Sequence, residues 1–134
     1  MRHLFIVDPL ARLVVTKDSS VLFMREAAKR GHSVHCVYVE QLSIGEQGRV
    51  LARASETRID ASAFHAGGAW YSLAEPQSVA CDEFDVVWMR KDPPVDLAFM
   101  RTVQLLTLIP APTVVVNDPN GLLAIEEKLL VLRF

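Results

Sequence analysis

The sequence predicts an α/β domain: a parallel sheet with helices on both faces and a small antiparallel hairpin inserted into it. Three observations support this class. Four short apolar runs, most of them ended by turn-forming residues, have the length and composition of buried strands. Segments with helical spacing separate the first run from the second and the third from the fourth. Of the 134 residues, 51% are hydrophobic and 22% are charged, a balance typical of one globular domain.

The first elements form a strand–helix–strand unit. Residues 4–7 are an apolar run that ends at Asp8-Pro9, a turn signal. Asp18 and the two serines that follow it can cap a helix, which we expect to stop at Gly31 because glycine favours the position after a helix. Residues 34–39 are the next predicted strand. A unit of this kind implies that its two strands are parallel.

The middle of the chain shows a different pattern. Residues 41–59 contain two glycines followed by alternating polar and apolar residues, which predicts an antiparallel hairpin with its turn at residues 45–48. Residues 65–71 contain two adjacent glycines, and we predict a loop there that leads into a short edge strand.

The last third of the chain returns to alternating strands and helices. We expect a strand at residues 84–89, an amphipathic helix at residues 97–108 and a buried strand at residues 113–116. A further helix is predicted from Leu122 to the end of the chain. Its last six residues, LLVLRF, carry no glycine, proline or cap. We therefore expect this helix to enter a second domain of a longer protein; the alternative is a terminal helix docked on its own core.

Composition excludes several classes of function. The formal net charge is -2 and the basic residues are scattered, so nucleic acid is not an expected partner. The two cysteines, Cys36 and Cys81, form neither a disulfide framework nor a zinc site, which favours a reducing compartment. The apolar run near the amino terminus is too short for a signal peptide, and no run approaches membrane-spanning length. We therefore expect a cytoplasmic protein with no membrane segment.

The most distinctive polar segment is Arg90-Lys91-Asp92-Pro93-Pro94, directly after a predicted strand. Ligands of open α/β sheets collect beyond the carboxyl ends of the strands. An arginine can hold a carboxylate or phosphate through two hydrogen bonds, and a lysine adds a point charge. We predict an anion-binding loop stiffened by its two prolines. The alternative is that the two cations only form local ion pairs with Asp92 and Asp96.

A second candidate segment, Lys17-Asp18-Ser19-Ser20, opens the first predicted helix. The backbone N–H groups of a helix N-terminus favour an anion, and Lys17 and the hydroxyl groups can assist. The alternative is an ordinary N-cap. The sequence has no Gly-rich phosphate loop, and its four histidines lack metal-ligand spacing. Neither a nucleotide loop, a metal site nor a complete catalytic set is therefore predicted within this chain.

Taken together, these segments resemble the amino-terminal domain of prokaryotic glutathione synthetases. The resemblance covers nearly the whole chain and rests on five segments that occur in the family's order and spacing: Ile6-Val7-Asp8-Pro9, Lys17-Asp18-Ser19-Ser20, Met89-Arg90-Lys91-Asp92-Pro93-Pro94, Asn117-Asp118-Pro119 and Glu127-Lys128-Leu129. The segment that begins at Met89 is the most specific, and the segment that begins at Lys17 is the next. The Asn117 segment departs from the family, in which Asn-Lys-Pro or a similar triplet is expected, and residues 41–80 match only loosely.

The resemblance implies a Rossmann-like, pre-ATP-grasp substrate-binding domain at residues 1–120 and, at residues 121–134, a helix leading into ATP-grasp domains that this chain lacks. It implies an ATP-dependent ligase that phosphorylates the cysteinyl carboxylate of γ-glutamylcysteine, after which the amine of glycine attacks the acyl phosphate. ATP and Mg²⁺ would bind mainly outside this chain, so the isolated domain would be inactive. The full-length enzyme would be a homo-oligomer.

Residue by residue, the resemblance implies a substrate-facing role for Lys17, Asp18, Ser19 and Ser20. It implies that Arg90 contacts the carboxylate or phosphoryl group, and that Lys91 and Asp92 hold the loop or an inter-domain contact. Asn117 would hold its own turn. None of these residues is implied to transfer a proton; positioning and charge stabilisation are the expected roles.

Two other functions are compatible with parts of the sequence. Another ATP-grasp ligase with a different acid substrate would share the fold, so the fold alone does not decide between them. A receiver-like signalling module would match the length. Such a module needs an acidic pair after its first strand, however, and here Asp8 is followed by Pro9.

Overall fold

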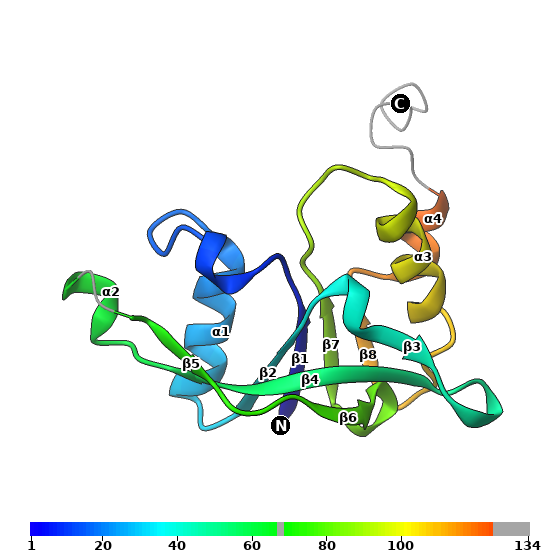
Figure 1. Ribbon diagram of the computed structural model, residues 1–134, viewed down its shortest axis with the longest axis horizontal. Coiled ribbons are helices and arrows are strands. Elements are labelled where there is room, and N and C mark those ends of the chain that lie inside the picture. The colour runs from blue at the N-terminus through cyan, green and yellow to red at the C-terminus, as the bar shows by residue number, and fades with distance from the viewer. Residues whose placement is uncertain (67–68, 125–134) are drawn as a thin grey trace.

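The computed structural model describes residues 1–66 and 69–124, and its centre is a mixed sheet (Figure 1). Neighbouring strands follow the order β3-β4-β2-β1-β7-β8, and both β5 and β6 pair with β4. The strands are β1 (Arg2–Ile6), β2 (Ser33–Val37), β3 (Leu42–Ile44), β4 (Val50–Ile59), β5 (Tyr71–Leu73), β6 (Gln77–Ala80), β7 (Val86–Met89) and β8 (Val114–Val116). The helices are α1 (Ser19–Lys29), α2 (Ala63–Ala66), α3 (Leu97–Leu106) and α4 (Pro119–Ala124).

Four strands, β2, β1, β7 and β8, form the parallel part of the sheet. In the centre, Phe5 of β1 lies opposite Cys36 of β2 and Trp88 of β7. The parallel pairing confirms the prediction from the strand–helix–strand pattern. It also brings the ends of β1 and β7 to the same edge of the sheet.

The antiparallel part is larger than the predicted hairpin. The β3–β4 hairpin is present, and its turn contains Gly48 with a positive φ of 78°. Strand β4 is ten residues long and also pairs with β2, β5 and β6. The sequence did not predict β6, because its short and largely exposed segment lacks a buried apolar run. The insert is therefore an antiparallel extension of the main sheet.

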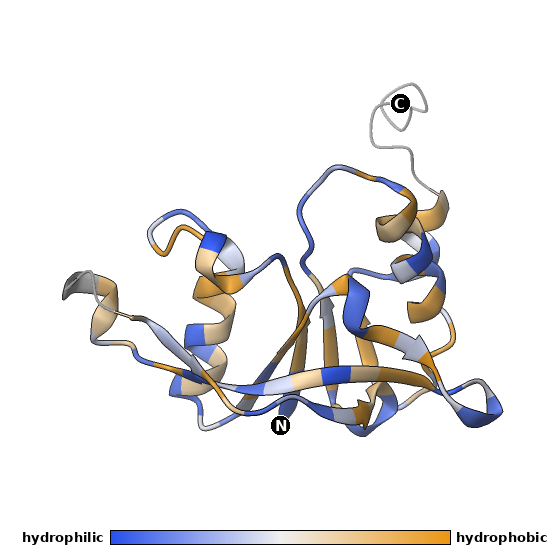
Figure 2. Ribbon diagram, viewed as in Figure 1, coloured by the Kyte–Doolittle hydropathy of each residue, from blue (hydrophilic) through white to orange (hydrophobic). Residues whose placement is uncertain are grey.

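Helices cover both faces of the parallel strands, as predicted (Figure 1). Alternate residues of β1 point to opposite faces, because the side-chain period of a strand is two. Leu4 and Ile6 belong to a buried cluster with Val103 and Leu106 of α3. Phe5 belongs to a second cluster that is packed against α1. Figure 2 shows the apolar residues concentrated on the central strands, and the polar residues in the loops above them.

Local signals fix the helix boundaries. The Asp18 side chain accepts a hydrogen bond from the backbone N–H of Ser20 (2.8 Å), so the predicted N-cap of α1 is confirmed. Gly31 follows α1 with a positive φ of 75°. Helix α4 begins at Pro119, three residues before the predicted start, because proline fits the first helical position. The predicted continuation of this helix, residues 125–134, lies outside the described residues, as do Gly67 and Gly68 of the predicted loop.

Both cysteines are packing residues. Cys36 is 4% exposed and Cys81 is fully buried, and both are free thiols. Burial raises the pKa of each thiol to about 12, so neither supplies a reactive thiolate near neutral pH. In the described part of the chain, no helix is both long and apolar enough to span a membrane.

A row of stacked rings crosses the α1 face of the sheet. The indole N–H of Trp88 donates to Nδ1 of His3 (3.0 Å), and Nε2 of His3 lies 2.9 Å from Nδ1 of His32. Since the indole is only a donor, Nδ1 of His3 must be unprotonated. On its other side, Trp88 stacks on Phe23, with ring centroids 5.4 Å apart. The row therefore connects a buried neutral histidine to helix α1.

This row predicts that stability falls in acid. Burial is the main reason why the pKa of His3 is lowered from 6.5, so its stabilising contribution is complete above pH 6.5 and is lost as the pH falls below that value. We expect the free energy of unfolding, measured with urea, to decrease between pH 7.5 and 5.5. His3→Gln should weaken this pH dependence, since an amide can accept from Trp88 and donate to His32 without titrating. An unchanged pH dependence in His3→Gln would exclude His3 as its source.

Candidate functional site

The two segments singled out in the sequence lie at one edge of the sheet. Ile6 and Met89 are paired at the ends of the parallel neighbours β1 and β7, so the loops that follow them leave side by side. Figure 1 shows both loops rising from this edge, where α1 also begins. The backbone N–H of Arg90 donates to the carbonyl of Ile6 (2.9 Å) and ties the two strand ends together.

Arg90 joins the loop after β7 to the start of α1. Its Nε donates to Oγ of Ser20 (3.1 Å) and its Nη2 donates to Oγ of Ser19 (2.5 Å). Its guanidinium lies over the ring of Phe23, 5.3 Å from the centroid. Among the described residues, no carboxylate forms an ion pair with Arg90. The guanidinium is thus held by neutral groups, and its positive charge remains available to a ligand.

Lys91 has a different role from Arg90. Its Nζ lies 3.0 Å from Oδ1 of Asp8, and it also donates to the carbonyl of Asp92 (2.8 Å). The other oxygen of Asp8 accepts the backbone N–H of Asp92 (2.9 Å). The ion pairs with Asp92 and Asp96 that the sequence left open are not formed: Lys91 pairs with Asp8 instead, and Asp96 caps α3 by accepting from the N–H of Phe99. Lys91 and Asp8 therefore fix the shape of the loop.

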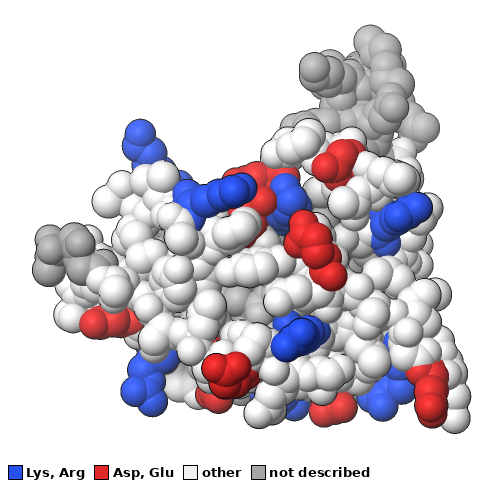
Figure 3. Space-filling view, in the orientation of Figure 1, with Lys and Arg blue, Asp and Glu red and all other residues white. Residues whose placement is uncertain are grey.

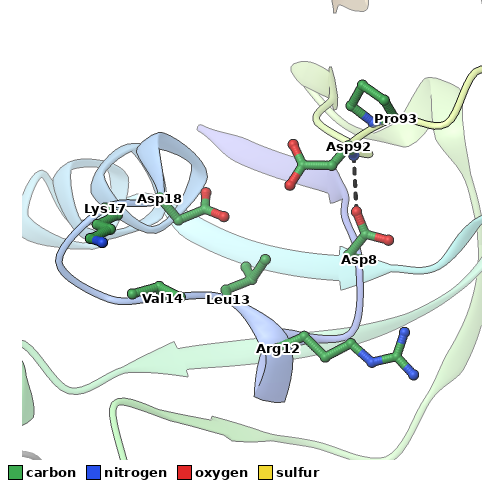
Figure 4. A pocket seen from close by; sticks show the side chains of 8 residues that line it. All are labelled: Asp8, Arg12, Leu13, Val14, Lys17, Asp18, Asp92 and Pro93. Carbon is green, nitrogen blue, oxygen red and sulfur yellow. Dashed lines mark hydrogen bonds between the residues drawn. The ribbon is translucent and has the colours of Figure 1, made fainter.

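A cleft of about 400 Å³ opens between the loop after β1 and the loop after β7 (Figure 4). Three predicted site residues line it: Lys17, Asp18 and Asp92. Pro93 of the predicted anion-binding loop lines it as well, together with four residues that were not predicted as site residues: Asp8, Arg12, Leu13 and Val14. Around the hollow between the α1 side and the α3 side, Figure 3 shows Lys and Arg side chains next to Asp and Glu side chains.

Arg12 was not predicted as a site residue, because no motif marks the segment between Asp8-Pro9 and α1. A short 3₁₀ turn, Leu10–Arg12, bends this segment, and the fully buried side chain of Leu10 anchors it. The turn places Arg12 on the wall of the cleft. An isolated leucine after Asp8-Pro9 was the one sequence signal for this anchor, and by itself it does not predict a cleft.

The arrangement can bind and orient a charged ligand. Two serine hydroxyls at the start of α1 hold the Arg90 guanidinium. Within residues 1–66 and 69–124, no three His, Cys, Asp or Glu side chains come together as a metal site. The titratable groups of the cleft show no nucleophile–base pair. A guanidinium held by neutral groups can position an anion and stabilise its charge.

Comparisons with known proteins show which family this chain resembles. A family model described as "Prokaryotic glutathione synthetase, N-terminal domain" matches residues 1–122. The glutathione synthetase of Gloeobacter violaceus is 39% identical over 141 residues, covering 100% of this chain and 42% of that protein. The glutathione synthetase of Bradyrhizobium diazoefficiens is 36% identical, covering 96% of this chain and 39% of that protein. The glutathione synthetase of Xanthomonas axonopodis pv. citri is 37% identical, covering 96% of this chain and 40% of that protein. The chain thus spans about two fifths of the length of these curated relatives.

Proposed function

Because this chain belongs to the family of N-terminal domains of prokaryotic glutathione synthetases, we propose that it forms one wall of the peptide-substrate site of an ATP-dependent ligase. The ligase joins γ-glutamylcysteine to glycine. We assign the substrate wall to the start of α1 and the loop after β7, and the peptide-contacting residues are Lys17, Asp18, Ser19, Ser20, Arg90 and Asp92.

The observation that supports this assignment is that the Arg90 guanidinium is held in place by neutral groups. A cation held by Ser19 and Ser20, with no carboxylate partner among the described residues, is ready to bind a carboxylate or an acyl phosphate. Both serine oxygens accept from Arg90, so the hydroxyl hydrogen of the exposed Ser19 can still be donated to a ligand oxygen, whereas Ser20 is 3% exposed and supports the guanidinium. The Lys91–Asp8 pair supports this geometry by holding the loop on which Arg90 lies.

The proposed reaction has two steps. The cysteinyl carboxylate of γ-glutamylcysteine attacks the terminal phosphorus of ATP, and ADP leaves. The amine of glycine then attacks the acyl carbon, inorganic phosphate leaves, and the amine loses a proton. In both steps negative charge lies on the oxygens around the reacting carboxyl group. Arg90 and the Ser19 hydroxyl would stabilise that charge and orient the group.

We propose that ATP and Mg²⁺ bind to parts of the full-length protein beyond this chain. In support, the sequence carries no Gly-rich phosphate loop, and the described residues form no metal cluster. Residues 1–120 would then be the substrate-binding domain, and residues 121–134 would lead into the ATP-binding part of the full-length protein. A cytoplasmic location fits the two free, buried thiols. The proposed full-length enzyme is a homo-oligomer.

The ligase proposal is tested by measuring ADP release from the full-length protein. ADP should form when γ-glutamylcysteine, glycine and ATP–Mg²⁺ are all present, and omission of either amino-acid substrate should abolish sustained release. The 134-residue chain alone should form no product and should bind ATP only weakly. Sustained ADP release with a different acid in place of γ-glutamylcysteine, and none with γ-glutamylcysteine, would assign the protein to another ATP-dependent ligase.

A further inference from the structure

The cleft next to Arg90 presents charges of both signs that have no partner among the described residues. The carboxylate of Asp92 and the side chains of Arg12 and Lys17 form no hydrogen bond or ion pair there, and Asp18 uses only Oδ1, as the N-cap. Asp8 is different, because Lys91 and the Asp92 N–H occupy its two oxygens. The cleft therefore offers two open acidic groups and two open cations.

These groups surround a space that can admit an amino-acid head group. The cleft volume of about 400 Å³ lies within the range of small-molecule sites. In Figure 4 the carboxylates of Asp18 and Asp92 extend into the gap between the two loops, and Arg12 and Lys17 lie on the wall formed by the segment before α1. An ammonium and a carboxylate on one carbon atom would match both kinds of charge at once. A simple anion would meet the two carboxylates and be repelled.

We infer that this cleft binds the zwitterionic α-amino-acid end of the γ-glutamyl residue. Its ammonium lies at Asp92 and Asp18, and its carboxylate is held by Lys17, which lies beside Asp18 in Figure 4. The inference rests on the proposed function, which requires the other end of the dipeptide, the cysteinyl carboxylate, to reach ATP held outside this chain. The end that does not react is thus left for this cleft. Binding energy from such a remote group can be used to orient the reacting group.

The test compares three acids in the full-length protein: γ-glutamylcysteine, glutarylcysteine, which lacks the α-amino group, and 4-aminobutanoylcysteine, which lacks the α-carboxylate. The wild-type protein should show a kcat/KM for each analogue that is roughly 10- to 100-fold lower, since each leaves a charged group of the cleft unpaired. Asp92→Asn should lower kcat/KM for γ-glutamylcysteine roughly tenfold and leave that for glutarylcysteine nearly unchanged. Lys17→Met should lower kcat/KM for γ-glutamylcysteine roughly tenfold and leave kcat/KM for 4-aminobutanoylcysteine nearly unchanged.

The matched control is Glu75→Gln, an exposed acid between β5 and β6 and away from the cleft, which should change none of the three values. Equal use of all three acids by the wild-type protein would overturn the inference and leave the ligase proposal standing. An equal loss with γ-glutamylcysteine and glutarylcysteine in Asp92→Asn would also overturn it, because the carboxylate would then only hold the loop. If the wild-type protein turned over none of the three acids, the proposed function itself would fail.

Discussion

Arg90→Ala is expected to lower kcat/KM for γ-glutamylcysteine about 100-fold in the full-length protein, the size of effect seen when one preorganised charge-stabilising donor is lost. The variant removes a cation that two serine hydroxyls and the Phe23 ring hold at the edge of the sheet. The KM for ATP should stay close to that of the wild-type protein, because we place ATP beyond this chain. Initial-rate kinetics with γ-glutamylcysteine and ATP varied in turn measure both values.

Two further variants sharpen the Arg90 experiment. Arg90→Lys retains the charge but cannot reach Ser19 and Ser20 with a planar fork, so roughly a tenfold loss is expected. Arg53→Ala removes an exposed arginine of β4 and should have no effect on the kinetics. If Arg90→Ala had the same kinetics as the wild-type protein, Arg90 would be removed from the site.

Asp8→Ala is expected to give a large loss of stability, about 2 kcal/mol in the free energy of unfolding. The substitution leaves the Lys91 ammonium, whose side chain is 16% exposed, without its ion-pair partner and leaves the Asp92 N–H without its acceptor. Asp8→Asn should cost less, because an amide oxygen can still accept from that N–H. Urea unfolding of the 134-residue chain, followed by circular dichroism, measures both changes.

The matched control for Asp8 is Glu83→Ala. Glu83 also pairs with arginines, at 4.0 Å from Arg2 and 3.8 Å from Arg49, but its side chain is 50% exposed. Exposed pairs of this kind contribute roughly 0–1 kcal/mol, so Glu83→Ala should lower the free energy of unfolding much less than Asp8→Ala does. Equal losses in the two variants would show that the Asp8–Lys91 pair does not hold the loop.

Much of the fold follows from local signals in the sequence. The apolar runs are the parallel strands of the structure. Asp18 caps the start of α1, and Gly31, with its positive φ, follows the end of α1. The placement of the two candidate segments at one edge also followed from the sequence, since parallel strands carry their terminal loops to the same side. The family assignment excludes the receiver-like alternative, which the extended antiparallel part of the sheet also disfavours.

Other features depend on contacts between distant residues. The sequence offered Asp92 and Asp96 as neighbours for Lys91, whereas the partner is Asp8, on another strand end. Local reasoning cannot choose between carboxylates when the choice depends on the sheet register. In the same way, β4 pairs with four other strands, and β6 forms by pairing with residues of β4 that are distant from it in the sequence. The cleft needed the bend at Leu10 to bring Arg12 to a wall of the cleft that Asp92 also lines.

A crystal structure of the full-length protein with γ-glutamylcysteine bound would show whether Arg90 and the start of α1 contact the peptide substrate. We expect a carboxylate oxygen of the dipeptide within about 3.2 Å of the Arg90 guanidinium, with the γ-glutamyl end in the neighbouring cleft. A bound dipeptide with no atom within about 4 Å of residues 17–20 or 90–92 would show that this edge of the sheet is not the substrate wall.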